Sequence, residues 1–340
     1  MKIDSGLMGV GFGEMAARAK ALEEFGYDGL TTAETAHDPF LPLMIAAEHT
    51  SSIELQTGIA VAFARSPMTL ANTAWDLNLY SKGRMNLGLG SQIKPHITKR
   101  FSMPWSHPAA RMRELVLAMR SIWANWQDGT KLDFAGEFYT HTLMTPFFNP
   151  GPNQWGAPKV SLAAVGELMT EVAGEVCDGI LIHGFTTERY LREVTMPAIQ
   201  RGLATSGRAR DNFEINGPLF VVSGANEQEF TAAAAATKQQ IAFYGSTPAY
   251  RGVLDLHGWG DLQPELNALS KQGKWVEMGE LIEPEILDTF AVVSETIEGI
   301  APEMIKRFGD VVDRCSFYAP YRSDPERWRA VVEQLKAASR

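Results

Sequence analysis

Cysteine is scarce in this chain of 340 residues, which has only Cys177 and Cys315, far apart and neither in a CxxC pair. We therefore expect no disulfide framework and no cysteine-based zinc site, and a reducing compartment is indicated. A run of about 18 apolar residues, the length of a membrane-spanning helix, is also absent. The first residues, MKIDSGLMGVGFGEM, are too rich in glycine for a signal peptide. These absences predict a cytoplasmic protein without a membrane partner.

Positive charge is the minority sign. The 31 lysines and arginines are outnumbered by 40 aspartates and glutamates, which gives a formal net charge of −9, and no basic run stands out. This argues against a nucleic-acid partner. Hydrophobic residues make up 45% of the chain, enough for a sizeable core in one large domain or two ordinary ones.

Several familiar site motifs are missing. NLGLGSQ (86–92) supplies Gly88 and Gly90 for a GxGxxG fingerprint, but Ile93 occupies the third position, so a dinucleotide fold is not supported. The P-loop, HExxH and GxSxG motifs do not occur. The seven histidines show no metal-ligand spacing, so we expect no metal site.

What the chain does have is an alternation of strand and helix patterns. Strands are predicted at 2–7, 28–33, 53–63, 84–90, 159–165, 179–184, 213–224 and 311–320. Helices are predicted at 12–26, 39–50, 66–81, 108–128, 167–176, 188–206, 226–243 and 294–309, with a last one from Asp324. Parallel strands need crossovers, and eight such units favour a closed barrel. We predict an α/β fold, a (β/α)8 TIM barrel, as a single domain over 1–340 with insertions at about 131–158, a hairpin or ordered loop, and 245–285, an irregular segment.

In such a barrel the active site lies at the carboxyl ends of the strands. This rule locates the polar residues that follow each predicted strand. They are Glu34, Thr35, His37 and Asp38 after the second strand, Arg65 and Ser66 after the third, Ser91, Gln92, Lys94 and His96 after the fourth, and His183 at the end of the sixth.

The stretch ETAHDPF (34–40) has two compatible interpretations. Asp38 is a good N-cap and Pro39 suits the first helical position, which would make His37 a solvent-exposed neighbour of a helix cap. The same turn would bring His37 to the barrel mouth. Arg65 offers a partner on the rim for a carboxylate.

AAVGEL (163–168) lies where a strand ends and a helix begins. Free backbone N–H groups at Ala164, Val165 and Gly166, with the helix dipole behind them, would bind a phosphate, and the small side chains would let an anion approach. An ordinary tight turn is the alternative.

A longer stretch, LQTGIAVAFARSPMTLANTAWDLNLYSKGRMNLGLGSQ (55–92), resembles the signature of the luciferase-like monooxygenase superfamily: a strand, a helix after a proline, an S-x-GR turn and a glycine-rich strand. GYDGLTTAETAHDPF, the F-x-G-x-F-Y hairpin (134–139) and AGEVCDGILIHGF (173–185) match the same plan. The features AETAHDPF, AFARSP and GLGSQIKPH are similar to those of the actinobacterial branch that depends on the deazaflavin coenzyme F420.

The resemblance implies a (β/α)8 barrel, usually a homodimer, with a flavin or deazaflavin across its carboxyl-terminal mouth. It implies a non-prolyl cis peptide at Gly58–Ile59 that supports the ring, and a cofactor phosphate on Ala164–Val165–Gly166. The positions that it implies for contacts with the ring or its ribityl chain are Gly90, Ser91, Gln92 and His96.

The chain departs from the family pattern at two places. Glu34-Thr35 occupies the positions of an Asp-His pair found in some deazaflavin enzymes, and His37 follows two residues later. Ile93 lies near the position of a glutamate that sugar-phosphate dehydrogenases use as a proton donor, which argues against that activity.

The leading hypothesis is an F420-dependent oxidoreductase that moves a hydride to or from a small organic substrate. His37 would be the general acid or base, and Glu34 or Asp38 would orient it. The alternatives are an FMN-dependent monooxygenase and a non-catalytic barrel that binds a flavin-like ligand. The segments 131–158 and 245–285 would set the substrate.

Overall fold

The computed structural model describes residues 1–338, which form two compact units. The N-unit comprises Ser5–Leu181 and Ala198–Glu214. The C-unit comprises Met1–Asp4, Ile182–Pro197 and the chain from Ile215 onward. Both units combine parallel strands with helices, and the chain passes between them more than once. The single-domain organisation expected from the sequence stays a prediction.

Parallel strands form the centre of the N-unit. The pairs are β2 with β3, β3 and β4 with β5, and β5 with β8. All six residues of β5 are buried, as expected for a parallel strand covered on both faces. The strands of this unit are β2 (Gly29–Thr32), β3 (Glu54–Thr57), β4 (Ala60–Val61), β5 (Met85–Gly90), the short β6 (Phe134–Ala135) and β7 (Thr140–His141), and β8 (Lys159–Ala164).

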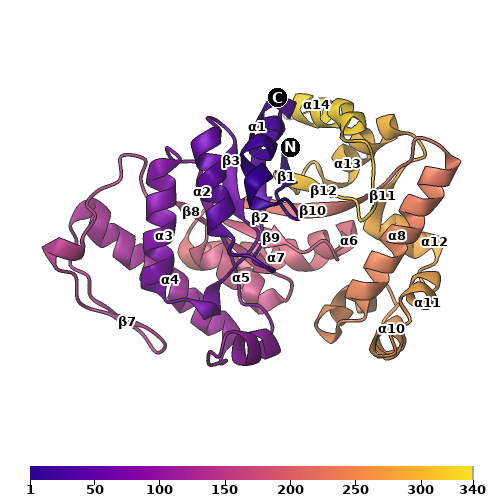
Figure 1. The fold of residues 1–340 in the computed structure, drawn as a ribbon. Helices are drawn as coiled ribbons and strands as arrows, with labels where there is room; N and C mark the ends of the chain where they lie inside the picture. Colours follow the sequence, from indigo (N-terminus) through magenta and orange to yellow (C-terminus); the bar gives the residue numbers. More distant parts are fainter. Residues whose placement is uncertain (339–340) are drawn as a thin grey trace. The chain divides into compact units, whose positions relative to one another are not determined.

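The helices of the N-unit pack in sequence order, and Figure 1 shows α2, α3 and α4 side by side. The predicted apolar face of the longest helix, Met112, Leu115, Val116, Met119 and Trp123, is buried throughout, which confirms the periodicity argument. These helices are α1 (Met15–Phe25), α2 (Phe40–His49), α3 (Pro67–Tyr80), α4 (Pro108–Asp128), α5 (Glu167–Val176) and most of α7 (Met196–Ser206).

The S-x-GR turn has a structural explanation. Lys82 and Gly83 both have a left-handed backbone, with φ of 59° and 85°, and they turn the chain from α3 into β5. Arg84 then donates to the carbonyl oxygens of Ile53 and Thr50 at 2.8 and 3.0 Å, so it ties the end of α2 to the start of β3. This motif organises the amino-terminal side of the strands.

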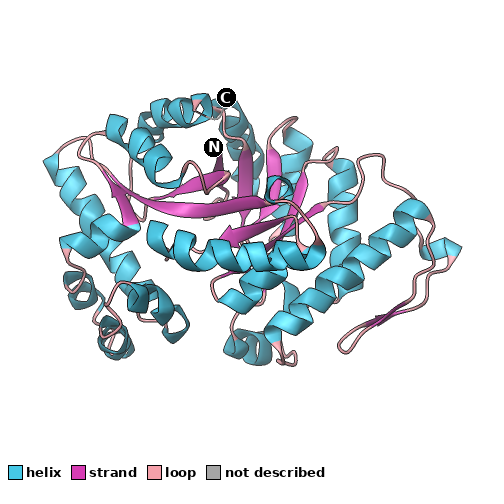
Figure 2. Cartoon of the chain, turned by 180° about the vertical axis from the view of Figure 1, so that it is seen from behind, coloured by secondary structure: helices cyan, strands magenta, loops and turns pink. Residues whose placement is uncertain are grey.

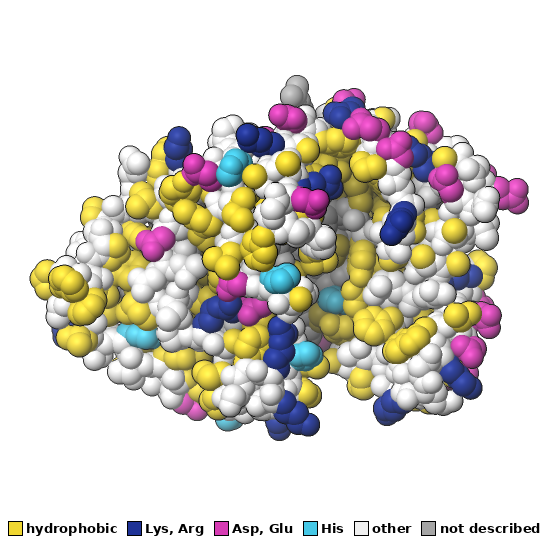
Figure 3. Space-filling model, in the orientation of Figure 1, with side chains coloured by type: hydrophobic (Ala, Val, Ile, Leu, Met, Phe, Trp, Pro, Cys, Tyr) yellow, Lys and Arg dark blue, Asp and Glu magenta, His cyan; other side chains and the backbone are white. Residues whose placement is uncertain are grey.

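The predicted hairpin in 131–158 is present as the antiparallel pair β6–β7, which lies on an extended arm in Figure 2. Glu114 of α4 holds it, because its carboxylate accepts from the backbone N–H groups of Glu137, Phe138 and Tyr139 at 2.9, 2.7 and 2.6 Å. The chain beyond the hairpin exposes the apolar side chains of Leu143, Phe147, Phe148 and Trp155. Figure 3 shows hydrophobic side chains gathered at the end of the face in view where Figure 1 labels β7.

In the C-unit the parallel order is β11–β10–β12–β1. Its elements are β1 (Lys2–Gly6) and β9 (Gly179–Ile182), each shared with the N-unit, then α6 (Glu188–Tyr190), β10 (Glu214–Val222), α8 (Glu227–Gly245), α9 (Arg251–Leu256), α10 (Leu262–Lys271), α11 (Trp275–Glu280), α12 (Pro284–Phe290), β11 (Ala291–Val293), α13 (Ile300–Phe308), β12 (Arg314–Tyr318) and α14 (Arg329–Ala337).

The expectation of an irregular segment at 245–285 is wrong. Four short helices, α9 to α12, occupy 251–290, and β11 follows them. Helices α10, α11 and α12 pack beside α8, and α9 contacts α10. Their buried core residues include Leu254, Leu266, Met278 and Leu287. Each is 6 to 10 residues long, so none spans enough turns to show a clear period in the sequence.

The fold class is nevertheless the one predicted, an α/β (β/α)8 barrel. Each predicted strand coincides with an observed one, the third divided into β3 and β4, and a helix follows each. Among the helices of residues 1–338, none is long and apolar enough to cross a membrane. Both cysteines are buried and free.

Candidate functional site

A charge cluster of the N-unit follows β2. The Glu34 carboxylate accepts from the Val61 N–H at 2.7 Å and from Arg65 Nη1 at 2.6 Å. Arg65 Nη2 reaches Asp38 Oδ2 at 3.1 Å, and the Arg65 guanidinium also lies over the Phe40 ring. One arginine thus joins both carboxylates of ETAHDPF, which confirms the expectation that Arg65 pairs with a carboxylate.

Asp38 caps α2, as predicted from the sequence. Its Oδ1 accepts from the N–H groups of Phe40 and Leu41 at 2.8 and 3.3 Å. The adjacent His37 is exposed, and its ring meets the Phe12 ring edge-on with centroids 5.4 Å apart. Within residues 1–338 neither carboxylate hydrogen-bonds to His37, and Arg65 engages both. The orienting role expected for Glu34 or Asp38 stays a prediction.

The peptide bond Gly58–Ile59 is cis, as the resemblance implies. Ile59 packs against Gly90 at the end of β5, where an added Cβ would lie 2.9 Å from Ile59 Cγ1. Gly88 lies even closer to Thr57: a Cβ added to Gly88 would lie 1.7 Å from the Thr57 carbonyl oxygen. The two glycines therefore let β3 and β5 approach at the carboxyl ends of the strands.

The residues after β5 turn sharply. Gln92 has a left-handed backbone, with φ of 58°, and its side chain accepts from the Ile93 N–H at 3.1 Å. Ser91 donates to the Gln92 carbonyl, also at 3.1 Å. His96 is exposed at the start of a short π-helical turn. The structure brings Gly90, Ser91 and Gln92 together with Ile59 and places His96 further along the loop.

The turn Ala164–Val165–Gly166 joins β8 to α5. Gly166 is the N-cap of α5, and among the described residues 1–338 no side chain caps the helix. A Cβ on Gly166 would meet nothing within 4 Å, so the space beside this residue is open. Glu167 lies in that turn, but Arg201 pairs with its carboxylate at 2.8 Å. The turn can therefore present backbone N–H groups to an anion.

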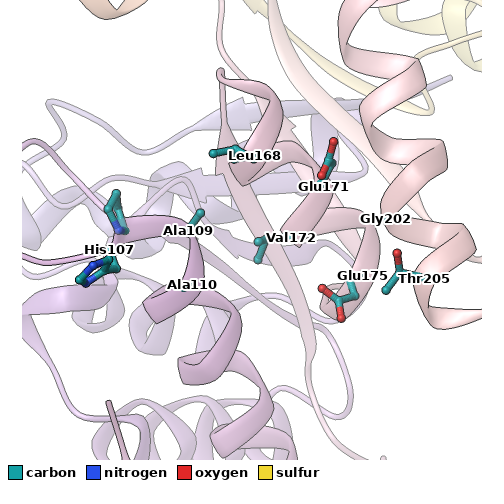
Figure 4. Close-up of a pocket in the computed structure, with 10 residues that line it drawn as sticks. His107, Ala109, Ala110, Leu168, Glu171, Val172, Glu175, Gly202 and Thr205 are labelled. Carbon is teal, nitrogen blue, oxygen red and sulfur yellow. The ribbon is translucent and has the colours of Figure 1, made fainter. Parts of the chain in front are cut away.

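A separate pocket of about 470 Å³ lies in the helix layer of the N-unit. Figure 4 shows its lining: the amino-terminal end of α4 with His107, one face of α5 with Leu168, Glu171 and Glu175, and Gly202 and Thr205 of α7. None of the predicted site residues lines it. Arg113 and Arg201 pair with Glu175 and Glu171 at 2.6 Å each, so the acidic groups are already neutralised.

Comparison with known proteins identifies the family. The family model of luciferase-like monooxygenases matches residues 2–314. The chain belongs to the luciferase-like monooxygenase family. An uncharacterized protein of Mycobacterium tuberculosis (strain ATCC 25618 / H37Rv) is 60% identical over 299 residues, 88% of each chain. A 5,10-methylenetetrahydromethanopterin reductase of Archaeoglobus fulgidus is 26% identical over 307 residues, 88% of this chain and 86% of the relative.

A solved structure resembles this luciferase-like protein over its whole length. It is the coenzyme F420 dependent tetrahydromethanopterin reductase of Methanopyrus kandleri, with a TM-score of 0.80 and 18% sequence identity over 100% of this chain and 99% of that one. At this identity the likeness concerns the fold alone, and it agrees with the barrel predicted from the sequence.

Sequence reasoning missed some of the residues that organise this luciferase-like chain. Three tyrosines of the C-unit were not candidates: Tyr244 and Tyr250, whose rings contact His183, and Tyr318, whose ring contacts Tyr244. Tyr318 ends a strand, so the rule that located the other candidates also indicates it. Tyr244 and Tyr250 lie at and beyond the end of α8, where no pattern singles them out. Among residues 1–338 no three His, Cys, Asp or Glu side chains are grouped to hold a metal ion.

Proposed function

We propose that this chain is an oxidoreductase that uses the deazaflavin coenzyme F420 for hydride transfer to or from a small organic substrate. Membership in the luciferase-like family supports a redox role. The observation that carries the proposal is the turn before α5, where no side chain among residues 1–338 caps the helix and the Cβ position of Gly166 meets open space. Such a turn fits the phosphate group of this cofactor.

In this proposal the chain mostly binds and orients. The turn Ala164–Val165–Gly166 would hold the phosphate through the N–H groups of Gly166 and of the first turn of α5. Gly58, Ile59 and Gly90 would offer a close-packed surface to one face of the ring. Ser91, Gln92 and His96 lie on the loop that would contact the ring or its side chain. F420, when bound, supplies a hydride donor or acceptor carbon. The main contribution of the protein is to hold the reactants close together in the orientation that the reaction needs.

His37 is the proposed general acid or base, because an imidazole can both donate and accept a proton. Glu34 and Asp38 act on it only through the turn that they stabilise with Arg65. Replacement by alanine, His37→Ala, tests the role with F420 binding and turnover measured side by side on a panel of carbonyl compounds. Unchanged turnover with intact binding would leave His37 as a neighbour of the helix cap.

The phosphate assignment is tested by Gly166→Asp. Gly166 has φ of −78° and ψ of 150°, which any residue adopts, and an aspartate there is a good N-cap. Its carboxylate would occupy the N–H groups that a phosphate needs, so we expect F420 affinity to fall by about tenfold or more while stability is kept or raised. Gly166→Ala is the matched control, since a methyl group there meets open space. Equal F420 affinity in all three proteins would refute the assignment.

FMN is the second candidate, favoured by the monooxygenases that give the family its name. Fluorescence titrations with F420 and FMN in parallel, read from the eight tryptophans, separate the two. Oxygen consumption with reduced FMN would favour a monooxygenase. Tight binding of either cofactor without turnover would favour a non-catalytic flavin-binding barrel. The homodimer and the cytoplasmic location stay predictions, and light scattering of the purified protein measures the first.

A further inference from the structure

A histidine and three tyrosines of the C-unit form one cluster of aromatic rings. The His183 ring centroid lies 4.6 Å from those of both Tyr244 and Tyr250, and the hydroxyl oxygens of Tyr244 and Tyr318 are 2.6 Å apart. All four side chains are half-buried. We call them the His–Tyr cluster.

The His–Tyr cluster lies where the fold places ligands. His183 directly follows β9, and Tyr318 is the last residue of β12. The carboxyl ends of the strands carry the active site in barrels of this class. The mechanism proposed for the N-unit uses none of these four residues.

Hydrogen bonding fixes the tautomer of His183. The Phe185 N–H donates to Nδ1 at 3.0 Å, so Nδ1 must be unprotonated and the ring proton sits on Nε2. Burial lowers the pKa of His183 to about 4, so the ring is neutral at pH 7. No other hydrogen bond of this ring occurs within the part of the chain that the structure describes, residues 1–338. The Nε2–H is therefore a neutral donor available to a ligand.

The tyrosine pair supplies a second donor. Only one proton can lie between the Tyr244 and Tyr318 oxygens, so the hydroxyl that accepts it still has its own proton to donate. Over residues 1–338 neither hydroxyl makes another hydrogen bond. Burial, together with the hydrogen bond between the Tyr244 and Tyr318 hydroxyls, raises the pKa of Tyr318, which keeps that hydroxyl protonated.

Packing behind the cluster holds these rings in place. Phe220 stacks on Tyr318 with centroids 4.5 Å apart and planes 11° apart. The Tyr318 ring packs against the backbone of Gly184, since a Cβ added to Gly184 would lie 2.8 Å from Tyr318 Cδ1. Phe185 lies nearly parallel to Tyr250 with centroids 6.0 Å apart. The donors are therefore pre-oriented, which lowers the entropy lost when a ligand binds.

The chemistry of the cluster selects one class of ligand. Flat aromatic walls favour a planar ring, and two N–H or O–H donors favour an acceptor oxygen. Because both donors are uncharged, a carboxylate or phosphate would lose its hydration without an opposing charge. A cation would face the positive ends of the donors. A neutral aromatic or conjugated carbonyl compound meets all of these conditions.

We propose that the His–Tyr cluster binds a neutral, planar carbonyl compound whose oxygen accepts from His183 Nε2–H and from the Tyr244–Tyr318 pair. That this compound is the substrate rests on the proposed function. That it binds to the cluster can be tested without the cofactor.

The test is a ligand-observed NMR titration of the full-length protein, without cofactor, using acetophenone as the probe. Tyr318→Phe removes one hydroxyl and keeps the ring. His183→Asn keeps an acceptor for the Phe185 N–H and removes the Nε2–H donor. We expect each variant to weaken acetophenone binding by about five- to tenfold, as for loss of one hydrogen bond. Tyr80→Phe, at an exposed position of the N-unit, is the control and should leave binding unchanged.

Three comparison ligands test the class: ethylbenzene lacks the oxygen, benzoate is an anion and benzyltrimethylammonium is a cation. We expect all three to bind more weakly than acetophenone. Equal binding of any of them, unchanged acetophenone binding in both cluster variants, or no binding up to about 5 mM would overturn the inference. An F420 titration of the same wild-type protein separates the two proposals. If acetophenone binds and F420 does not, only the cofactor assignment is refuted.

Discussion

Arg65 Nη1 lies 2.6 Å from Glu34 Oε2, and these two side chains are only 20% and 7% exposed. The same guanidinium reaches Asp38, which is 39% exposed, at 3.1 Å. Glu34 ends the turn after β2 and Arg65 the turn after β4, so the ion pair fixes two strand ends to each other. A carboxylate this deeply buried depends on its partner, because its hydration is lost.

Removal of Arg65 should therefore be costly. For Arg65→Met, which keeps an unbranched apolar chain, we expect the free energy of unfolding to fall by about 3 kcal/mol. Among residues 1–338, the Glu34 carboxylate is then left with only the Val61 N–H as a partner. Urea unfolding followed by tryptophan fluorescence measures the change.

The matched control is Lys131→Met, which removes an ion pair with Asp133 whose side chains are 81% and 60% exposed. We expect a loss of about 0.5 kcal/mol there, as for pairs on the surface. Similar losses in the two variants would contradict a special role for the pair between Arg65 and Glu34.

The contact between Gly90 and Ile59 gives a second prediction. In Gly90→Ala the new methyl group would lie 2.9 to 3.3 Å from Ile59 Cγ1, Cδ1 and Cβ, so one side chain must move. We expect a loss of about 1–3 kcal/mol in stability and weaker F420 binding, since the surface proposed to face the ring is distorted. Unfolding and cofactor titration measure the two effects.

The double variant Gly90→Ala/Ile59→Ala identifies the cause. It removes the Cγ1 and Cδ1 atoms that the new methyl group meets, so its cost should be less than the sum of the single costs. Additive costs would show that the methyl group acts on something other than Ile59.

The strands and long helices could be predicted because their patterns are local. In α4, for example, Met112, Leu115, Val116, Met119 and Trp123 recur over about three helical turns, and all are buried. Asp38 and Pro39 predicted the start of α2, because a helix cap involves only neighbouring residues. The short helices α9 to α12 could not be predicted, because each is too short to show a period and its apolar contacts are with other helices, α8 or one another.

The site was predictable only in part, for the same reason. Strand ends located Glu34, Arg65 and His183, but which side chains meet depends on distances across the fold. The sequence suggested that Glu34 orients His37, three residues away, whereas it binds Arg65, 31 residues away. Nothing local reveals that the Tyr244 and Tyr318 hydroxyls are 2.6 Å apart, since they are separated by 74 residues.

The hairpin offers a third prediction. In Glu114→Gln the carboxylate that accepts from Glu137, Phe138 and Tyr139 becomes an amide with one acceptor oxygen and one donor group. We expect these amides to exchange with solvent deuterium about ten- to a hundredfold faster, because charge-assisted hydrogen bonds are lost. Glu137→Gln changes an exposed carboxylate of the same hairpin and is the control. Unchanged protection in Glu114→Gln would mean that other contacts hold the segment.

The last prediction concerns pH and follows from His183. Burial lowers the pKa of this histidine to about 4 in the folded protein, below the value of about 6.5 for an unfolded chain. Between these values the unfolded state binds more protons, so stability falls as pH decreases through that window. For this residue alone we expect a loss of about 2 kcal/mol between pH 7 and pH 5.

His183→Asn keeps the acceptor for the Phe185 N–H but does not titrate, so the wild type should lose more stability than the variant over that range. Parallel urea unfolding of both proteins at the two pH values gives the difference. Equal pH dependence would mean that the imidazole is charged or solvated in the folded state. That result would contradict a neutral Nε2–H donor in the His–Tyr cluster.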